Sequence, residues 1–271
     1  MAEWVPPSRL PQRLDELKSN LRSWKPVEWV IFWGLIPAIL LIVYSLPQPV
    51  RDDWFILNTP YPGRIQTWFL SSYAHSQLYP HLIGNLAFYF VVLLMIFAFE
   101  NNRCRFRIMA AWSFLAVPVI SSLLTIAFWG LIGRTTTGQG FSAVTGALLA
   151  YAMFIFVVWG LQEKLDVFDH PELFTGTRIR YLVLKILLAV ILALIVVMGL
   201  LLGVFMDLGG SVSNGIVHFG GFITSLVVLL ALDLKYEKRL YFDTMLGASI
   251  LVGIFWYGLY LARLVGVVKG A

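Results

Sequence analysis

Seven long stretches of apolar residues, separated by short polar segments, dominate the sequence. A helix that crosses a bilayer needs about 20 mostly apolar residues. Stretches of this kind predict seven transmembrane spans: Val27–Leu46, His81–Phe99, Ile108–Phe128, Ser142–Leu161, Tyr181–Met206, Gly215–Leu232 and Thr244–Ala262. We therefore expect an all-α, polytopic membrane protein, with one transmembrane helical bundle over residues 27–268.

Two further regions depart from this pattern. Residues 1–26 are mostly polar but carry leucines at helical spacing: Leu10, Leu14, Leu17 and Leu21. This spacing predicts either an amphipathic helix on the membrane surface or a solvated tail with a short helix. The connection from residue 47 to residue 80 is rich in proline and aromatic residues. Because aromatic side chains favour the headgroup layer, we expect this first loop to lie at the membrane interface.

The composition agrees with a membrane protein and narrows the functional classes. Hydrophobic residues make up 59% of the chain and charged residues only 13%, against about 25% charged in soluble domains. The single cysteine, Cys104, excludes an intramolecular disulfide. Four histidines and few acidic residues do not suggest a metal centre, and no cofactor is implied. The net charge of +5 does not predict nucleic-acid binding, because membrane proteins gather Lys and Arg on one side.

The distribution of basic residues predicts the orientation. Fifteen of the 20 Lys and Arg residues lie in the N-terminal tail, in the connections after the second, fourth and sixth spans, or in the first turns of the fifth span. Basic residues mark the cytoplasmic side. We expect a multi-pass protein of the cell membrane, with a cytoplasmic N-terminus and an extracellular C-terminus. The sequence shows no internal repeat, so it gives no support to an inverted-repeat transporter.

Polar side chains stand near the starts of the second, fourth and sixth spans, which all run from outside to inside. These residues are His81, Ser142 and His218. Asn85 follows His81 by one helical turn, so both lie on one face. Small residues follow Ser142 and surround His218, and such faces let membrane helices approach closely. The Ser142 hydroxyl could thus reach the His218 ring near the outer membrane face.

Such a pair has a recognisable chemistry. A serine becomes a nucleophile when a neighbouring base takes its proton, and histidine can be that base. An oxyanion would then need hydrogen-bond donors. Candidates are the side chains of His81 and Asn85 and the backbone N–H groups of Phe141 and Ser142, with Gly140 allowing an unusual backbone beforehand. No Asp or Glu lies near His218 in its span, so we expect a dyad, and hydrolysis requires a hydrated cavity.

Three sequence motifs carry a family resemblance: HLIGN in the second span, GFS at the start of the fourth and HFGG in the sixth. In this order they resemble the rhomboid intramembrane serine proteases. The resemblance implies a six-span core with a C-terminal seventh span. It also implies that Ser142 is the nucleophile, that His218 is the base and that His81 and Asn85 serve the oxyanion. Single-span transmembrane proteins in the lipid bilayer would be the substrates.

The chain also departs from the family pattern. Ala143 and Gly146 stand where many rhomboids have a glycine and an aromatic residue, and the Trp-Arg pair common in the first loop is absent. A further rhomboid histidine often precedes the second-span histidine by five residues, whereas His75 precedes His81 by six. We expect His75 to be an interfacial, structural residue.

Other interpretations remain open from the sequence. Ser142 could be a small packing residue, His218 a structural histidine, and His81 with Asn85 a cap at the start of a span. A rhomboid-like pseudoprotease would bind membrane clients without cutting them, and a transporter would move a solute. A zinc protease would need H-E-x-x-H, which is absent. An aspartyl protease would need two aspartates deep in spans, but Asp207 and Asp233 lie at span ends.

Overall fold

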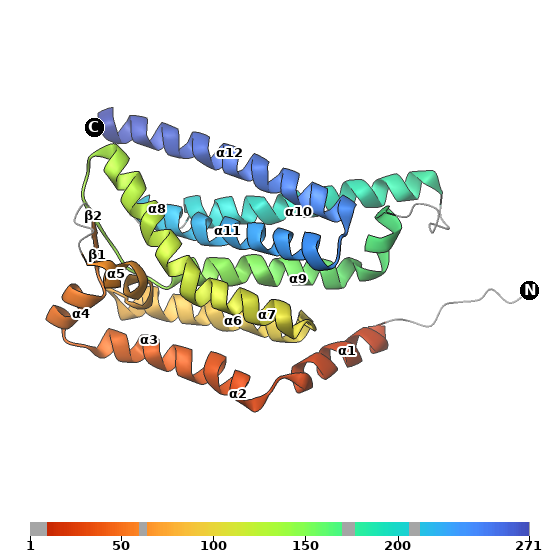
Figure 1. Ribbon diagram of the computed structural model, residues 1–271, viewed down its shortest axis with the longest axis horizontal. Coiled ribbons are helices and arrows are strands. Elements are labelled where there is room, and N and C mark those ends of the chain that lie inside the picture. Colours follow the sequence, from red (N-terminus) through yellow and green to blue (C-terminus); the bar gives the residue numbers. More distant parts are fainter. Residues whose placement is uncertain (1–9, 60–63, 170–176, 206–211, 271) are drawn as a thin grey trace, which may run out of the picture.

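The computed structural model describes residues 10–59, 64–169, 177–205 and 212–270. The chain there is mostly helical (Figure 1). Its helices are α1 (Leu10–Ser23), α2 (Pro26–Trp29), η1 (Val30–Leu35), α3 (Ile36–Ser45), α4 (Gln48–Trp54), α5 (Ile65–Leu70), η2 (Ser71–Tyr73), η3 (Leu78–Leu82), α6 (Ile83–Phe99), α7 (Arg103–Ala111), η4 (Trp112–Ala116), α8 (Val117–Ile132), α9 (Ser142–Asp169), α10 (Arg178–Phe205), α11 (Val212–Tyr236) and α12 (Leu240–Gly270). The strands are β1 (Leu57–Thr59) and β2 (Thr136–Gly138).

The apolar stretches form the expected bundle. Within the described ranges, six helical stretches are long and apolar enough to cross a bilayer: Pro26–Ser45, Arg103–Ile132, Ser142–Leu161, Arg178–Leu201, Gly215–Tyr236 and Leu240–Arg263. The second predicted span corresponds to α6, a shorter apolar helix that η3 extends at its start. The prediction of an all-α, polytopic membrane protein is therefore confirmed.

The helices extend beyond the predicted spans. The third span was expected to begin at Ile108, but its helix starts at Arg103, and α12 runs from Leu240 to Gly270 rather than from Thr244 to Ala262. Hydropathy detects only the apolar part of a helix, whereas backbone hydrogen bonding continues through its polar ends. Met206, the predicted end of the fifth span, lies outside the described residues.

Wider π-helical turns interrupt two of the helical stretches next to prolines. Pro37 follows η1 and Pro118 follows η4. A proline inside a helix has no N–H to donate, and its ring clashes with the carbonyl one turn earlier. The wider turn relieves this conflict, so the chain continues as a helix on both sides.

The bundle has two distinct ends (Figure 1). The strand end carries β1, β2, α4, α5 and the starts of α6, α9 and α11. The opposite, turn end carries α1, the start of α7, the start of α10 and the α11–α12 turn. The segments in which the sequence concentrates Lys and Arg therefore gather at the turn end.

The first loop is folded against the rest of the strand end. Its strand β1 pairs antiparallel with β2, so that Leu57 faces Gly138 and Thr59 faces Thr136. The Thr59 hydroxyl also donates to the carbonyl of Thr136, at 3.1 Å. This ribbon ties residues before α6 to the segment that leads directly into α9.

The N-terminal tail contains the expected helix, α1, and packs at the turn end of α6. The Asn20 amide donates to the carbonyl of Ala98 at 3.0 Å, and the Trp24 indole N–H donates to the carbonyl of Phe97 at 2.7 Å. Carbonyls in the last turn of a helix have no partner within it. The N-terminal segment therefore supplies hydrogen bonds that α6 cannot make for itself.

A buried ion pair also holds α6 at the turn end. Glu100, which directly follows α6, is fully buried and accepts two hydrogen bonds from the Arg105 guanidinium, at 2.8 and 2.9 Å. The Tyr151 hydroxyl on α9 donates to the same carboxylate. Buried charge is tolerated when it is paired and hydrogen-bonded in this way. The cluster therefore fixes α6 and α7 against α9.

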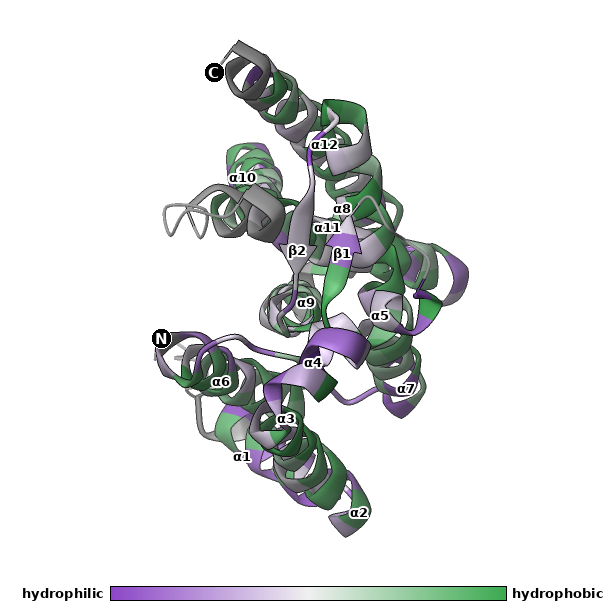
Figure 2. Ribbon diagram, turned by 90° about the vertical axis from the view of Figure 1, so that its left-hand side faces the viewer, coloured by the Kyte–Doolittle hydropathy of each residue, from purple (hydrophilic) through white to green (hydrophobic). Residues whose placement is uncertain are grey.

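Helix α9 occupies the centre of the bundle, in contact with α6, α8, α10 and α11 (Figure 2). Its closest approach is to α11, and glycines make that approach possible. A Cβ on Gly221 would lie 2.3 Å from the carbonyl oxygen of Ala143, and one on Gly146 would lie 3.1 Å from that of His218. Both obstacles are backbone atoms, which cannot rotate away. Any side chain at Gly221 would therefore push the two helices apart.

We expect Gly221→Ala to lower the free energy of unfolding by about 1–3 kcal/mol, the usual cost of an overpacked core. The matched control is Gly160→Ala in α9, where an added Cβ would meet no atom within 4 Å. Because alanine favours helix over glycine, the control should be neutral or stabilising by up to about 1 kcal/mol. Thermal unfolding in detergent measures the stability of both variants. Equal midpoints for the two variants would contradict the close α9–α11 contact.

Candidate active site

Ser142 is the first residue of α9, at the strand end of the bundle. The helix start is well formed, because the carbonyl of Phe141 accepts from the Thr145 N–H at 3.1 Å and the Thr145 hydroxyl donates to the carbonyl of Ser142 at 2.9 Å. The first N–H groups of a helix have no partner within it, and they carry the positive end of its dipole. The Ser142 side chain thus lies where developing negative charge is favoured.

The backbone before Ser142 follows a path that requires glycine. Gly140 has φ of +140°, and its N–H donates to the carbonyl of Ser71 at 2.9 Å. A Cβ at Gly140 would lie 3.2 Å from His81 Nε2 and 3.7 Å from Ser142 Oγ. Residues with a side chain rarely adopt this φ, and the space is already bordered by two candidate site residues. Gly140 therefore shapes the site through its backbone.

A fully buried histidine from the first loop joins the predicted oxyanion residues. His75 Nε2 lies 3.0 Å from Asn85 Nδ2 and accepts from the Phe141 N–H at 3.4 Å. Its ring meets the His81 ring edge to face, with centroids 4.8 Å apart. Phe141 is itself fully buried and packs against Tyr73, Tyr89 and Phe114. Four side chains from three parts of the sequence thus lie close together beside Ser142: His75, His81, Asn85 and Phe141.

His218 lies on α11 where that helix touches α9. Its side chain is buried, with 4% exposed, and its carbonyl is the atom that a Cβ on Gly146 would meet. The first two turns of α9 are therefore in backbone contact with the second and third turns of α11. In the part of the chain that the structure describes, no hydrogen bond joins the Ser142 hydroxyl to His218. The observed contact is thus between the backbones of the two helices.

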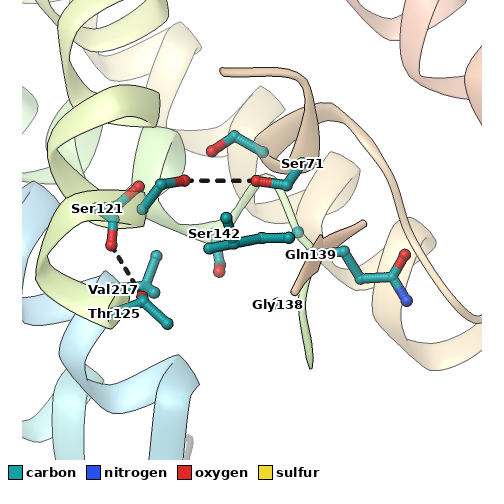
Figure 3. A pocket seen from close by; sticks show the side chains of 11 residues that line it. Ser71, Ser121, Thr125, Gly138, Gln139, Ser142 and Val217 are labelled. Carbon is teal, nitrogen blue, oxygen red and sulfur yellow. Dashed lines mark hydrogen bonds between the residues drawn. The ribbon is translucent and has the colours of Figure 1, made fainter. Parts of the chain in front are cut away.

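A small cavity lined in part by hydroxyl side chains opens beside Ser142 (Figure 3). Its volume is about 20 Å³, enough for one water molecule. The lining includes Ser142, Val217 next to His218, Gln139 and hydroxyl side chains from the first loop and α8. Those hydroxyl side chains are Ser71, Ser72, Ser121, Ser122 and Thr125. A water there would have several hydrogen-bond partners within reach of the Ser142 hydroxyl.

The structure brings the sequence-predicted residues together at the strand end. Ser142, Gly140, Phe141, His81 and Asn85 form one cluster, and His218 adjoins it through the α9–α11 contact. The Phe141 N–H and one N–H of Asn85 point to His75, so these two donors are already engaged. The donors that remain for an oxyanion are the Ser142 N–H, the second Asn85 N–H and His81.

The structure places His75 in the candidate site, which its sequence position does not predict. The sequence predicts an interfacial, structural residue, whereas the His75 side chain is fully buried and bonded to two candidate site residues. The signal available in the sequence was its position shortly before His81 and Asn85. Spacing alone could not reveal the contact, because η2 and the following turn fold His75 back toward α6.

Comparison with known proteins supplies no relative: no family model, no curated protein and no solved structure matches this chain. The functional assignment therefore rests on the residues of the site.

The buried state of His75 predicts how stability depends on pH. Burial and the neighbouring His81 lower the pKa of His75 well below 6.5. The unfolded chain then binds a proton at this residue near pH 6.5, while the folded chain does not, so stability falls as the pH drops below 6.5. We expect the titration of His75 to lower the free energy of unfolding by about 2 kcal/mol when the pH falls from 7.5 to 5.

His75→Gln removes this titration and should flatten the dependence of unfolding free energy on pH over the same range. Denaturant unfolding in detergent at pH 5, 6 and 7.5 measures the difference between wild type and variant. The same slope in both proteins would show that His75 is not held neutral in the fold.

Proposed function

We propose that this chain is a rhomboid-type intramembrane serine protease. It hydrolyses peptide bonds of single-span transmembrane proteins by a dyad of Ser142 and His218. The observation that carries the proposal is the placement of Ser142. Its hydroxyl lies at a helix start, borders a cavity of about 20 Å³ that several other hydroxyl side chains also line, and adjoins the segment of α11 that holds His218.

The roles follow from the chemistry of the groups. His218 takes the proton of the Ser142 hydroxyl as it attacks the substrate carbonyl, and then returns it to the leaving amine. The negative charge on the carbonyl oxygen is stabilised by the Ser142 N–H, Asn85 and His81. Water from the hydroxyl-lined cavity then attacks the acyl-enzyme. His218 removes a proton from this water, and Ser142 leaves as the regenerated hydroxyl.

The position of the site predicts where substrates are cut. Ser142 lies at the strand end, whereas the basic segments gather at the turn end, which we assign to the cytoplasm. Cleavage then occurs near the outer face of the cell membrane. A helical peptide bond is protected by its own hydrogen bonds. Substrates with Gly or Pro near the cut are therefore favoured, because these residues destabilise a helix.

Ser142→Ala and His218→Ala should each lower cleavage of a single-span substrate in proteoliposomes by about 10⁴-fold or more, since nucleophile and base act as a unit. Ser225→Ala is the matched control. Ser225 is a fully buried serine on α11, two turns beyond His218, and its hydroxyl has no hydrogen bond within the described residues. The Ser225→Ala variant should cleave the substrate at a rate within a few-fold of the wild-type rate.

Gel analysis of the cleaved substrate, with unfolding midpoints for each variant, decides the outcome. Folded wild type that binds the substrate without cutting it would instead favour a client-binding pseudoprotease. Unchanged cleavage by Ser142→Ala would exclude this serine as the nucleophile.

A further inference from the structure

The geometry around His75 supports a function beyond packing. Its ring is fully buried in the first loop, outside the Ser142–His218 pair, yet its Nε2 contacts two groups next to the nucleophile. These are the side-chain amide of Asn85, at 3.0 Å, and the N–H of Phe141, at 3.4 Å. Asn85 belongs to α6 and Phe141 directly precedes α9. One nitrogen atom thus connects the helices on both sides of the site.

The chemistry of imidazole determines how this connection works. A ring nitrogen accepts a hydrogen bond only when it carries no proton. The backbone N–H of Phe141 can only donate, so Nε2 must be the acceptor and the ring proton must be on Nδ1. Asn85 must then present its NH₂ group, and not its carbonyl oxygen, to the same atom. The backbone donor therefore fixes the state of His75, and His75 fixes the orientation of Asn85.

This arrangement has a consequence for catalysis. An asparagine amide that can flip would direct its carbonyl oxygen toward an oxyanion for part of the time, which is repulsive. With one N–H held by His75, the second N–H of Asn85 keeps a constant direction. The hydrogen bond to Phe141 likewise holds the peptide that precedes Ser142. Donors that are already oriented stabilise a transition state without reorganisation at the moment of reaction.

We propose that His75 is a positioning residue of the oxyanion site, which holds the Asn85 amide and the Phe141 peptide in the orientation that the reaction needs. This inference rests on the proposed protease function. His75 does not touch the reacting atoms. It acts as a buried acceptor for two donors, so another acceptor at the same place should replace it.

The test uses three substitutions that separate acceptor position from packing. In His75→Gln the side-chain oxygen can reach the place of Nε2. In His75→Asn the shorter side chain places its oxygen nearer to Nδ1. In His75→Leu the side chain fills much of the volume but accepts no hydrogen bond. Each variant is measured with a single-span substrate in proteoliposomes for kcat and KM, and in detergent for its unfolding midpoint.

We expect His75→Leu and His75→Asn to lower kcat by about 10²-fold, the effect of losing one oxyanion donor, with KM changed only a few-fold. His75→Gln should keep kcat within about tenfold of wild type. A residue needed only for packing would show no such rescue by glutamine. If His75→Leu does not fold, the comparison of glutamine with asparagine still decides the question.

Combination with Asn85→Ala provides a second readout. If His75 acts mainly through Asn85, then His75→Leu should reduce kcat little further once Asn85 is removed. Three results would overturn the inference. They are an equal loss of kcat in all three His75 variants, an effect on KM alone, and full additivity of the kcat losses with Asn85→Ala.

Failure of the protease function is distinguishable from failure of this inference. A wild type that cleaves while Ser142→Ala does not establishes the reaction, and the His75 variants are then compared against it. A folded wild type that cleaves nothing would refute the protease function and this inference together. Cleavage by wild type without the rescue pattern would refute the role of His75 alone.

Discussion

The close contact between α9 and α11 is the constraint on which the candidate site depends. Gly146 and Gly221 bring the two backbones so near that a methyl group at Gly221 would collide with the carbonyl of Ala143. This contact places the first two turns of α9, which begin with Ser142, against the second and third turns of α11, which hold His218. Lipid tails are as apolar as the helices, so packing of small residues is a main source of association between them. The same residues thus serve stability and the geometry of the pair.

The first loop completes the site from the other side. Its strand pairs with β2, Ser71 accepts the Gly140 N–H, and His75 bonds to Asn85 and Phe141. All of these contacts act on the few residues before Ser142 or on the start of α6. A segment of irregular backbone in a membrane protein needs partners for its polar groups. Here the loop and the segment before α9 supply them to each other, and a small cavity with several hydroxyl side chains in its lining forms between them and α8.

Much of this architecture could be predicted from the sequence. Apolar stretches identify the spans because the bilayer demands about 20 such residues, and they predicted the bundle and the order of its helices. They could not predict that the third helix begins at Arg103, since polar ends remain helical. Ser142, His81, Asn85 and His218 stand out as candidate site residues because polar residues at span starts are unusual. His75 was underestimated because its role depends on how the first loop folds back. The β1–β2 pairing is equally non-local and left no clear pattern in either segment.

The central claim is that Ser142 is a nucleophile activated by His218. The most direct measurement is covalent labelling of the folded protein in proteoliposomes by a serine-reactive phosphonate, with the modified residue identified by mass spectrometry. We predict an adduct on Ser142 in wild type and little or none in His218→Ala, because the hydroxyl needs a base to attack phosphorus. Folded wild type that stays unmodified at Ser142, or a His218→Ala variant labelled at the wild-type rate, would contradict the account.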